Sequence, residues 1–109
     1  MAKCGLNETT GLATGVGISR ARSEASSTAH SNARINASAE YDAWKASQHC
    51  PAQCPIKNFS FAFPPGATEE VEIIQVGGKP VQMVTVRMPW KATVNCQRVI
   101  DVFGPPKTN

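Results

Sequence analysis

Large apolar residues are distributed unevenly along this chain of 109 residues. They are sparse before Cys50 and dense from Ile56 to Phe103, so the pattern predicts that the C-terminal half builds the core. A sheet of about 50 residues buries little apolar surface relative to the chain entropy that folding removes. We therefore expect this sheet to need support from a helix, a crosslink, a metal or a partner chain.

The clearest helical signal lies between Ser19 and His49. Residues 20–48 contain no glycine and no proline, and Ser19 is a suitable N-cap for a helix. Alanine recurs at every fourth position of this segment, and an aromatic residue continues the row: Ala21, Ala25, Ala29, Ala33, Ala37 and Tyr41. Because residues four apart share one face of a helix, the spacing predicts a long helix over residues 19–49 with a stripe of small side chains.

The alanine stripe has two interpretations. Alanine is the best helix former and so stabilises a mostly solvated helix, whereas small side chains also let a second backbone approach closely. A helix of about 29 residues is about 43 Å long, and a strand of about eight residues is about 27 Å long. Unless the helix breaks near residues 26–28, it extends beyond such a sheet, and this favours self-association through the stripe.

Residues 1–18 are rich in glycine and threonine and show no regular period. The glycines at positions 11, 15 and 17 make a strand marginal in isolation, because glycine loses more backbone freedom on folding than other residues. We expect a flexible arm here, or an arm that becomes ordered on a neighbouring subunit.

Prolines end the helix, and four strand-like runs follow. Pro51 and Pro55 disfavour helical geometry at the residues before them, and the glycine pair at residues 77–78 is a tight-turn signal. The runs are Phe59–Phe63, Glu70–Val76, Val81–Met88 and Ala92–Phe103, with a break at Pro89-Trp90. Because the connections are short, the predicted fold class is α+β, with a long N-terminal helix followed by a four-stranded antiparallel meander in a domain of residues 50–109.

The candidates for a site are the four cysteines, Cys4, Cys50, Cys54 and Cys96. Cys50 and Cys54 lie in the junction between helix and sheet, residues 49–55. A disulfide between Cys96 and either junction cysteine would link the helix end to the sheet and contribute about 3–4 kcal/mol. Cys50, Cys54 and Cys96, with either Cys4 or His49 as the fourth ligand, form a possible tetrahedral zinc site, although one Cys-x3-Cys pair is weaker evidence than two paired Cys-x2-Cys motifs. Unpaired thiols are the third possibility, because proteins made in the cytosol keep their cysteines reduced.

Charge and hydropathy argue against several classes of function. The net charge of +3 comes from scattered lysines and arginines, which disfavours nucleic-acid binding. No stretch reaches the length of about 20 apolar residues that spans a bilayer. The start of the chain does not resemble a secretory signal, so we expect a cytoplasmic location by default, with leaderless export as the alternative.

The sequence lacks the pattern that catalysis requires. No base is placed to activate a cysteine, and no phosphate-binding loop or nucleophile elbow occurs. We therefore predict a small non-catalytic interaction or assembly protein, without a cofactor, that forms homo-oligomers or joins a larger protein assembly through the helix and the arm. A small zinc-binding module is the first alternative, and a thiol-redox or regulatory protein that binds a partner is the second.

Overall fold

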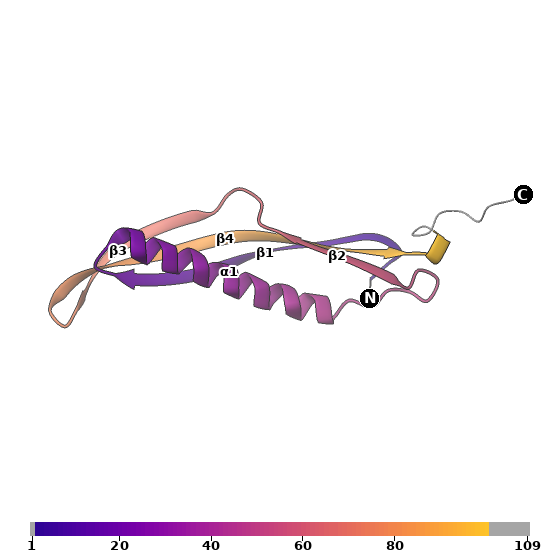
Figure 1. Cartoon of the computed structure of the whole chain (residues 1–109), viewed down its shortest axis with the longest axis horizontal. Helices are drawn as coiled ribbons and strands as arrows, with labels where there is room; N and C mark the ends of the chain where they lie inside the picture. The colour runs from indigo at the N-terminus through magenta and orange to yellow at the C-terminus, as the bar shows by residue number, and fades with distance from the viewer. Residues whose placement is uncertain (1, 101–109) are drawn as a thin grey trace, which may run out of the picture.

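The computed structural model describes residues 2–100 of the chain. These residues form one helix and four strands, in the order β1 (Gly5–Ser19), α1 (Arg22–Ala46), β2 (Ile56–Ala62), β3 (Thr68–Val76) and β4 (Lys79–Gln97). The strands make one antiparallel sheet, and α1 lies along one of its faces (Figure 1). The structure is mostly sheet, with 51% of the described residues in strands and 27% helical.

Strand β4 is the centre of the sheet. On one side it pairs with β1, from Gly5↔Cys96 to Ser19↔Gln82. On the other side, β2 pairs with the C-terminal half of β4 and β3 pairs with its N-terminal half. β4 ends at Gln97, and the positions from 101 onward, into which the sequence extends the last strand, lie outside the described residues.

The expected fold is wrong at its beginning, because a strand precedes the helix. The residues predicted as a flexible arm form β1. In β1 the residues that face α1 are small, as Ala13, Gly15 and Gly17 are, whereas Leu12 and Ile18 point to the opposite face. This alternation is inverted relative to an ordinary half-buried strand, whose buried side carries the large residues. Apolar periodicity therefore does not reveal β1.

The expected fold is also wrong near its end, because β4 continues through Pro89 where a break is predicted. Proline has no N–H to donate to a ladder. However, β2 ends opposite Lys91 and β3 begins opposite Arg87, so Pro89 lies where the neighbouring strand is interrupted. Gly66 lies in that interruption at φ 121°, and a Cβ added there would be 3.7 Å from Pro89 Cγ. The sheet is therefore not a meander, since its last strand is also its central one.

The helix contacts the sheet through a seam of very small residues. Four alanines are fully buried on this side of α1: Ala25, Ala29, Ala33 and Ala37. A Cβ added to Gly15 would lie 2.2 Å from the nitrogen of Ala33, and one added to Gly17 would lie 2.0 Å from the carbonyl oxygen of Ala25. Both positions require glycine because the two backbones approach so closely. The alanine stripe is a packing seam within one chain.

The helix is continuous from Arg22 to Ala46, with no break at residues 26–28. Its N-cap residue is Ala21, and the side chain of Ser19 accepts a hydrogen bond from the Ala21 N–H and donates one to Glu24. The 25 residues of α1 span about 37 Å, whereas the 19 residues of β4 span about 63 Å. The sheet therefore extends beyond the helix, which reverses the overhang expected from short strands.

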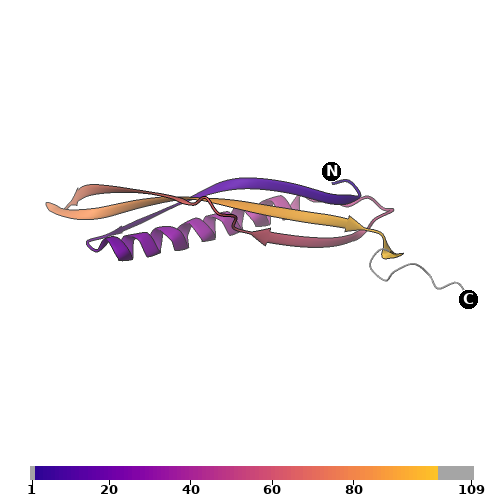
Figure 2. The ribbon, with the colours of Figure 1, turned by 90° about the horizontal axis from the view of Figure 1, so that it is seen from above.

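The molecule is long and thin. Its Cα atoms extend over 78 × 25 × 16 Å, with a radius of gyration of 20.3 Å, whereas a compact domain of this length has about 13 Å. Figure 2 shows a long twisted sheet with α1 on one side. The opposite face carries no second layer in the described part of the chain.

A cluster of aromatic residues joins the second half of α1 to β2. Tyr41 stacks on Phe61 with ring centroids 4.4 Å apart, and Trp44 meets Phe59 edge to face at 6.3 Å. The first half of the helix packs on β1 through the alanine seam, so α1 crosses the sheet diagonally from β1 toward β4 and β2 (Figure 2).

We expect Gly15→Ala to lower the free energy of unfolding by about 2–3 kcal/mol, because the added methyl group forces α1 and β1 apart. Urea unfolding of the purified protein measures the change. Thr14→Ala is the control, because it introduces alanine at the preceding position, where the side chain lies on the opposite face of the sheet. It should lower the free energy of unfolding by less than about 1 kcal/mol. Equal stability of the two variants would contradict the close seam.

Candidate functional site

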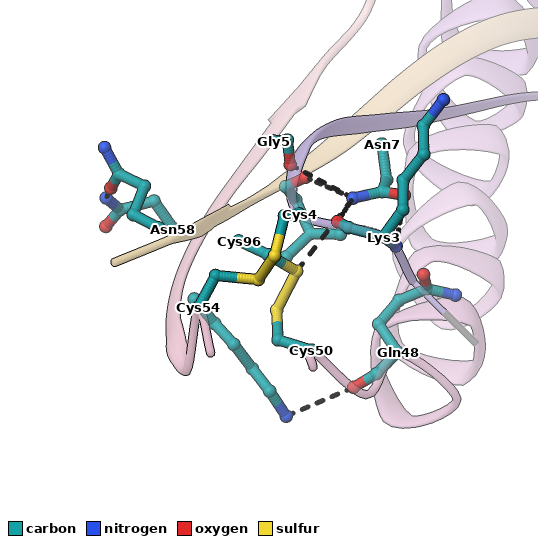
Figure 3. The surroundings of a disulfide bond; sticks show 12 residues. Lys3, Cys4, Gly5, Asn7, Gln48, Cys50, Cys54, Asn58 and Cys96 are labelled. Carbon is teal, nitrogen blue, oxygen red and sulfur yellow. Dashed lines mark hydrogen bonds between the residues drawn. A yellow bond between two sulfur atoms is a disulfide. The ribbon is translucent and has the colours of Figure 1, made fainter. Parts of the chain in front are cut away.

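Two disulfides lie side by side at the end of the molecule that holds the start of β1 and the end of β4 (Figure 3). Cys4 is bonded to Cys54 and Cys50 to Cys96, with Cα–Cα distances of 5.8 and 5.6 Å. The predicted link between Cys96 and a junction cysteine is confirmed, and Cys4 adds a second bond to the same junction. No cysteine within residues 2–100 is free.

Hydrogen bonds reinforce this end of the molecule. The Asn7 carboxamide donates to the carbonyl oxygens of Lys3 (2.7 Å) and Gly5 (3.1 Å), and it accepts from the Lys3 N–H (3.0 Å). Lys57 Nζ donates to the carbonyl oxygen of Gln48 (3.1 Å), just after α1 ends. The junction is thus held to the sheet by covalent and polar contacts, which fix the position of the helix end.

The sulfur atoms are not arranged to bind a metal. Zinc binds thiolates, and a sulfur atom in a disulfide is not one. His49 is exposed, and its backbone carbonyl accepts a hydrogen bond from the Ala2 N–H (3.2 Å). In the described part of the chain, no group of three or more histidine, cysteine, aspartate or glutamate side chains is placed to hold a metal ion. The geometry of these residues gives the zinc interpretation no support.

A polar cluster that sequence reasoning missed connects α1 to β3. Ser26 Oγ donates to Glu69 Oε2 (2.8 Å), and Arg22 forms an ion pair with the same carboxylate (3.6 Å). His30 Nδ1 lies 2.8 Å from the carbonyl oxygen of Ser26. No local signal reveals the cluster, because Ser26 and Glu69 are separated by 43 residues.

Serine, histidine and a carboxylate also form hydrolase sites, but this cluster has a different geometry. In a catalytic triad the imidazole lies between the hydroxyl and the carboxylate and takes the hydroxyl proton. Here the Ser26 hydroxyl donates directly to Glu69 (2.8 Å), and His30 Nδ1 lies closer to the Ser26 carbonyl oxygen (2.8 Å) than to the Ser26 hydroxyl (3.4 Å). The cluster therefore acts as a link between helix and sheet.

The face of the sheet opposite α1 is open and partly apolar. On β1, large side chains on this face are between 40% and 57% exposed: Leu6, Leu12, Val16 and Ile18. The sheet register places Met83 beside Ile18 and Val81 beside Ile74 on the same face. Apart from Leu6, these apolar residues lie in the part of the face away from the disulfides.

Most charged residues on the open face are paired with one another. Arg87 lies 3.1 Å from Glu70, and Lys91 lies 3.3 Å from Glu8. These side chains are well exposed, so the pairs contribute little to stability. They do reduce the charge that a partner would meet, and the face combines apolar and neutralised polar surface as protein interfaces do.

The residues predicted to mediate self-association are mostly inside the molecule. Tyr41 is half-buried against Phe61, and Ala21 is exposed just before α1. The others are covered by the chain's own sheet and are unavailable to a second copy: Ala25, Ala29, Ala33 and Ala37. The candidate contact surface is therefore the open face of the sheet, which could be identified from the sequence only if residues 5–19 were known to form a strand.

Comparisons with protein-family models, with curated proteins and with solved structures find no match to this chain. Among residues 2–100, no helix combines the length and the hydropathy that crossing a membrane needs.

We expect the double variant Cys50→Ser/Cys96→Ser to have a free energy of unfolding about 4 kcal/mol lower than the native protein, since the disulfide closes a loop with a sequence separation of 46. Urea unfolding without reductant measures this. As a control, alkylation of the denatured native chain should modify no cysteine before reduction and all four afterwards. An unchanged unfolding midpoint, or thiols that react before reduction, would contradict the assigned pairs.

Proposed function

We propose that this chain is a non-catalytic assembly protein that associates with copies of itself through the open face of its sheet. The observation that carries this proposal is the uncovered apolar surface on that face, where Leu12 and Ile18 are 57% and 53% exposed. Contiguous apolar surface on a soluble protein usually marks a contact site. The open face takes the place of the alanine stripe, which is already occupied by the chain's own sheet.

The dimensions of the open face support a stable contact. The 19 residues of β4 span about 63 Å, and three strands are about 14 Å wide. The resulting area of about 900 Å² is comparable with the roughly 800 Å² that each partner buries in a standard interface. Two such faces fit together as stacked sheets, which pack about 10 Å apart.

The disulfides support a role in an oxidising compartment, because cytosolic proteins generally keep their thiols reduced. This differs from the cytoplasmic default that the start of the chain suggests. The disulfides also weaken the two alternative functions. A zinc module needs thiolates, and a thiol-redox protein needs sulfur atoms that a partner can reach, whereas Cys54 and Cys96 are buried.

Ile18→Glu tests the open face. We expect the native protein to have at least twice the mass of one chain at high concentration, and the variant to have a lower mass at the same concentration, because a carboxylate buried in the open-face contact would lose its hydration. Size-exclusion chromatography with light scattering over a range of concentrations measures both masses.

The control for this test is Ile35→Glu, which makes the same change at an isoleucine of α1 that is 63% exposed. It should leave the oligomer intact. A native protein that is monomeric at every concentration would contradict the proposal, and so would equal dissociation of the two variants.

A further inference from the structure

Strand β1 lies at an edge of the sheet, and its outer side is covered along only part of its length. The Asn36 carboxamide donates to the carbonyl oxygen of Thr14 (2.6 Å), and the Asn32 carboxamide donates to that of Val16 (2.8 Å). Over residues 5–12 no side chain of the described helix makes such a bond. This bare half of β1 presents backbone donors and acceptors on the side away from β4.

The helix leaves the bare half of β1 accessible because it crosses the sheet diagonally. Its second half lies over β4 and directs Tyr41 and Trp44 toward the aromatic residues of β2. A shallow depression of about 560 Å³ opens there, and its lining includes Leu6, Glu8, Trp44 and Gln48. The depression leaves space beside Leu6 and Glu8, and the end of the helix borders that space through Trp44.

The other free edges are better protected against strand addition. β3 carries Glu69, Glu70 and Glu72, so a second β3 beside it would bring like charges together. β2 has only seven residues and includes Lys57. Charged side chains and short strands are common protections of sheet edges. The bare half of β1 has a single charged residue, Glu8, and that side chain is already in an ion pair.

The pairing of β1 with β4 determines which backbone groups face outward. The carbonyl oxygens of Thr14 and Val16 accept bonds from the helix on the outer side. Backbone groups alternate in direction along an antiparallel strand, so the even-numbered residues of β1 direct their N–H and C=O groups away from β4. A second antiparallel strand must therefore pair its own outward-facing residues with these positions.

We propose that the bare half of β1 pairs with the same segment of a second copy, edge to edge and antiparallel, about a two-fold axis at Thr9. In this register Leu6 lies opposite Leu12 of the second copy, and Glu8 lies opposite Thr10 of the second copy. All four positions are even-numbered, so their outward-facing groups meet, and no two charged residues are directly opposite. The two sheets become one continuous sheet.

Self-complementarity identifies a second copy as the occupant. Pairing about Thr9 places similar side chains opposite each other, because Leu6 lies opposite Leu12 and the small residues Gly5 and Ala13 lie opposite one another. Gly5 begins the strand, and Asn36 occupies the edge from Thr14 onward. A two-fold contact uses the same patch on both partners, so this symmetry is what a dimer requires. The contact rests on the proposed self-association but uses a different surface from the open face.

Thr10→Pro tests the edge contact without altering the ladder to β4. Proline removes an N–H that points outward, and two-fold symmetry makes this a loss of two hydrogen bonds per dimer, so the Kd should rise about tenfold or more. Thr14→Pro is the matched control, with the same change on the same face of the strand but outside the paired segment. It should leave the Kd unchanged in sedimentation equilibrium.

A cysteine at the two-fold axis reports the register. Residues on that axis form a non-hydrogen-bonded pair with Cα atoms about 4.5 Å apart, a distance that a disulfide can span. We expect Thr9→Cys to give a covalent dimer under mild oxidation, joined at position 9 as read by peptide mass spectrometry. Ile35→Cys, at the exposed isoleucine of α1 outside both proposed contacts, is the control and should stay monomeric on a non-reducing gel.

The outcomes separate the edge contact from the open-face association. A weaker dimer in Thr10→Pro together with a crosslink at position 9 supports the edge contact. Association that is lost in Ile18→Glu but unaffected by Thr10→Pro would overturn the edge contact and leave the open-face proposal standing. A crosslink in Ile35→Cys and none in Thr9→Cys would overturn the register, and a native protein that is always monomeric would overturn both proposals.

Discussion

The close contact between α1 and β1 is the constraint on which the rest of the structure depends. Gly15 and Gly17 allow the helix backbone to lie directly on the strand, where any side chain would collide with it. A seam of glycine and alanine buries little apolar surface per residue. The aromatic cluster at Tyr41 and Trp44 and the two disulfides supply further attachment at the other end of the helix. One helix covers one face, so the opposite face and part of the β1 edge stay open.

Local chemistry made part of this arrangement predictable from the sequence. The absence of glycine and proline over residues 20–48 predicts the helix, which forms over Arg22–Ala46. The glycine pair at residues 77–78 predicts the turn between β3 and β4, where both glycines have positive φ. The disulfide between Cys96 and a cysteine of the junction could also be predicted from the sequence. Two cysteines follow the helix directly, and only one cysteine lies in the predicted strands.

The features that depend on distant contacts were not predictable in the same way. β1 is identified as a strand only by its partner β4, because its buried side carries glycine and alanine instead of large apolar residues. Pro89 is compatible with a central strand only because β2 and β3 are interrupted opposite it. The contact of Ser26 with Glu69 bridges two elements far apart in the sequence. The candidate contact surface belongs to this group, since both the open face and the bare edge require β1 to be placed first.

We propose that the alanine stripe is used within the chain while β1 makes the contacts between copies. Methyl NMR spectra of the protein over a dilution series test it most directly, because each methyl group reports its own surroundings. The account predicts that the methyl signals of Leu12 and Ile18 move as the concentration rises, while those of Ala29 and Ala33 stay fixed. Concentration-dependent shifts of the alanine methyl signals with constant Leu12 and Ile18 signals would contradict it.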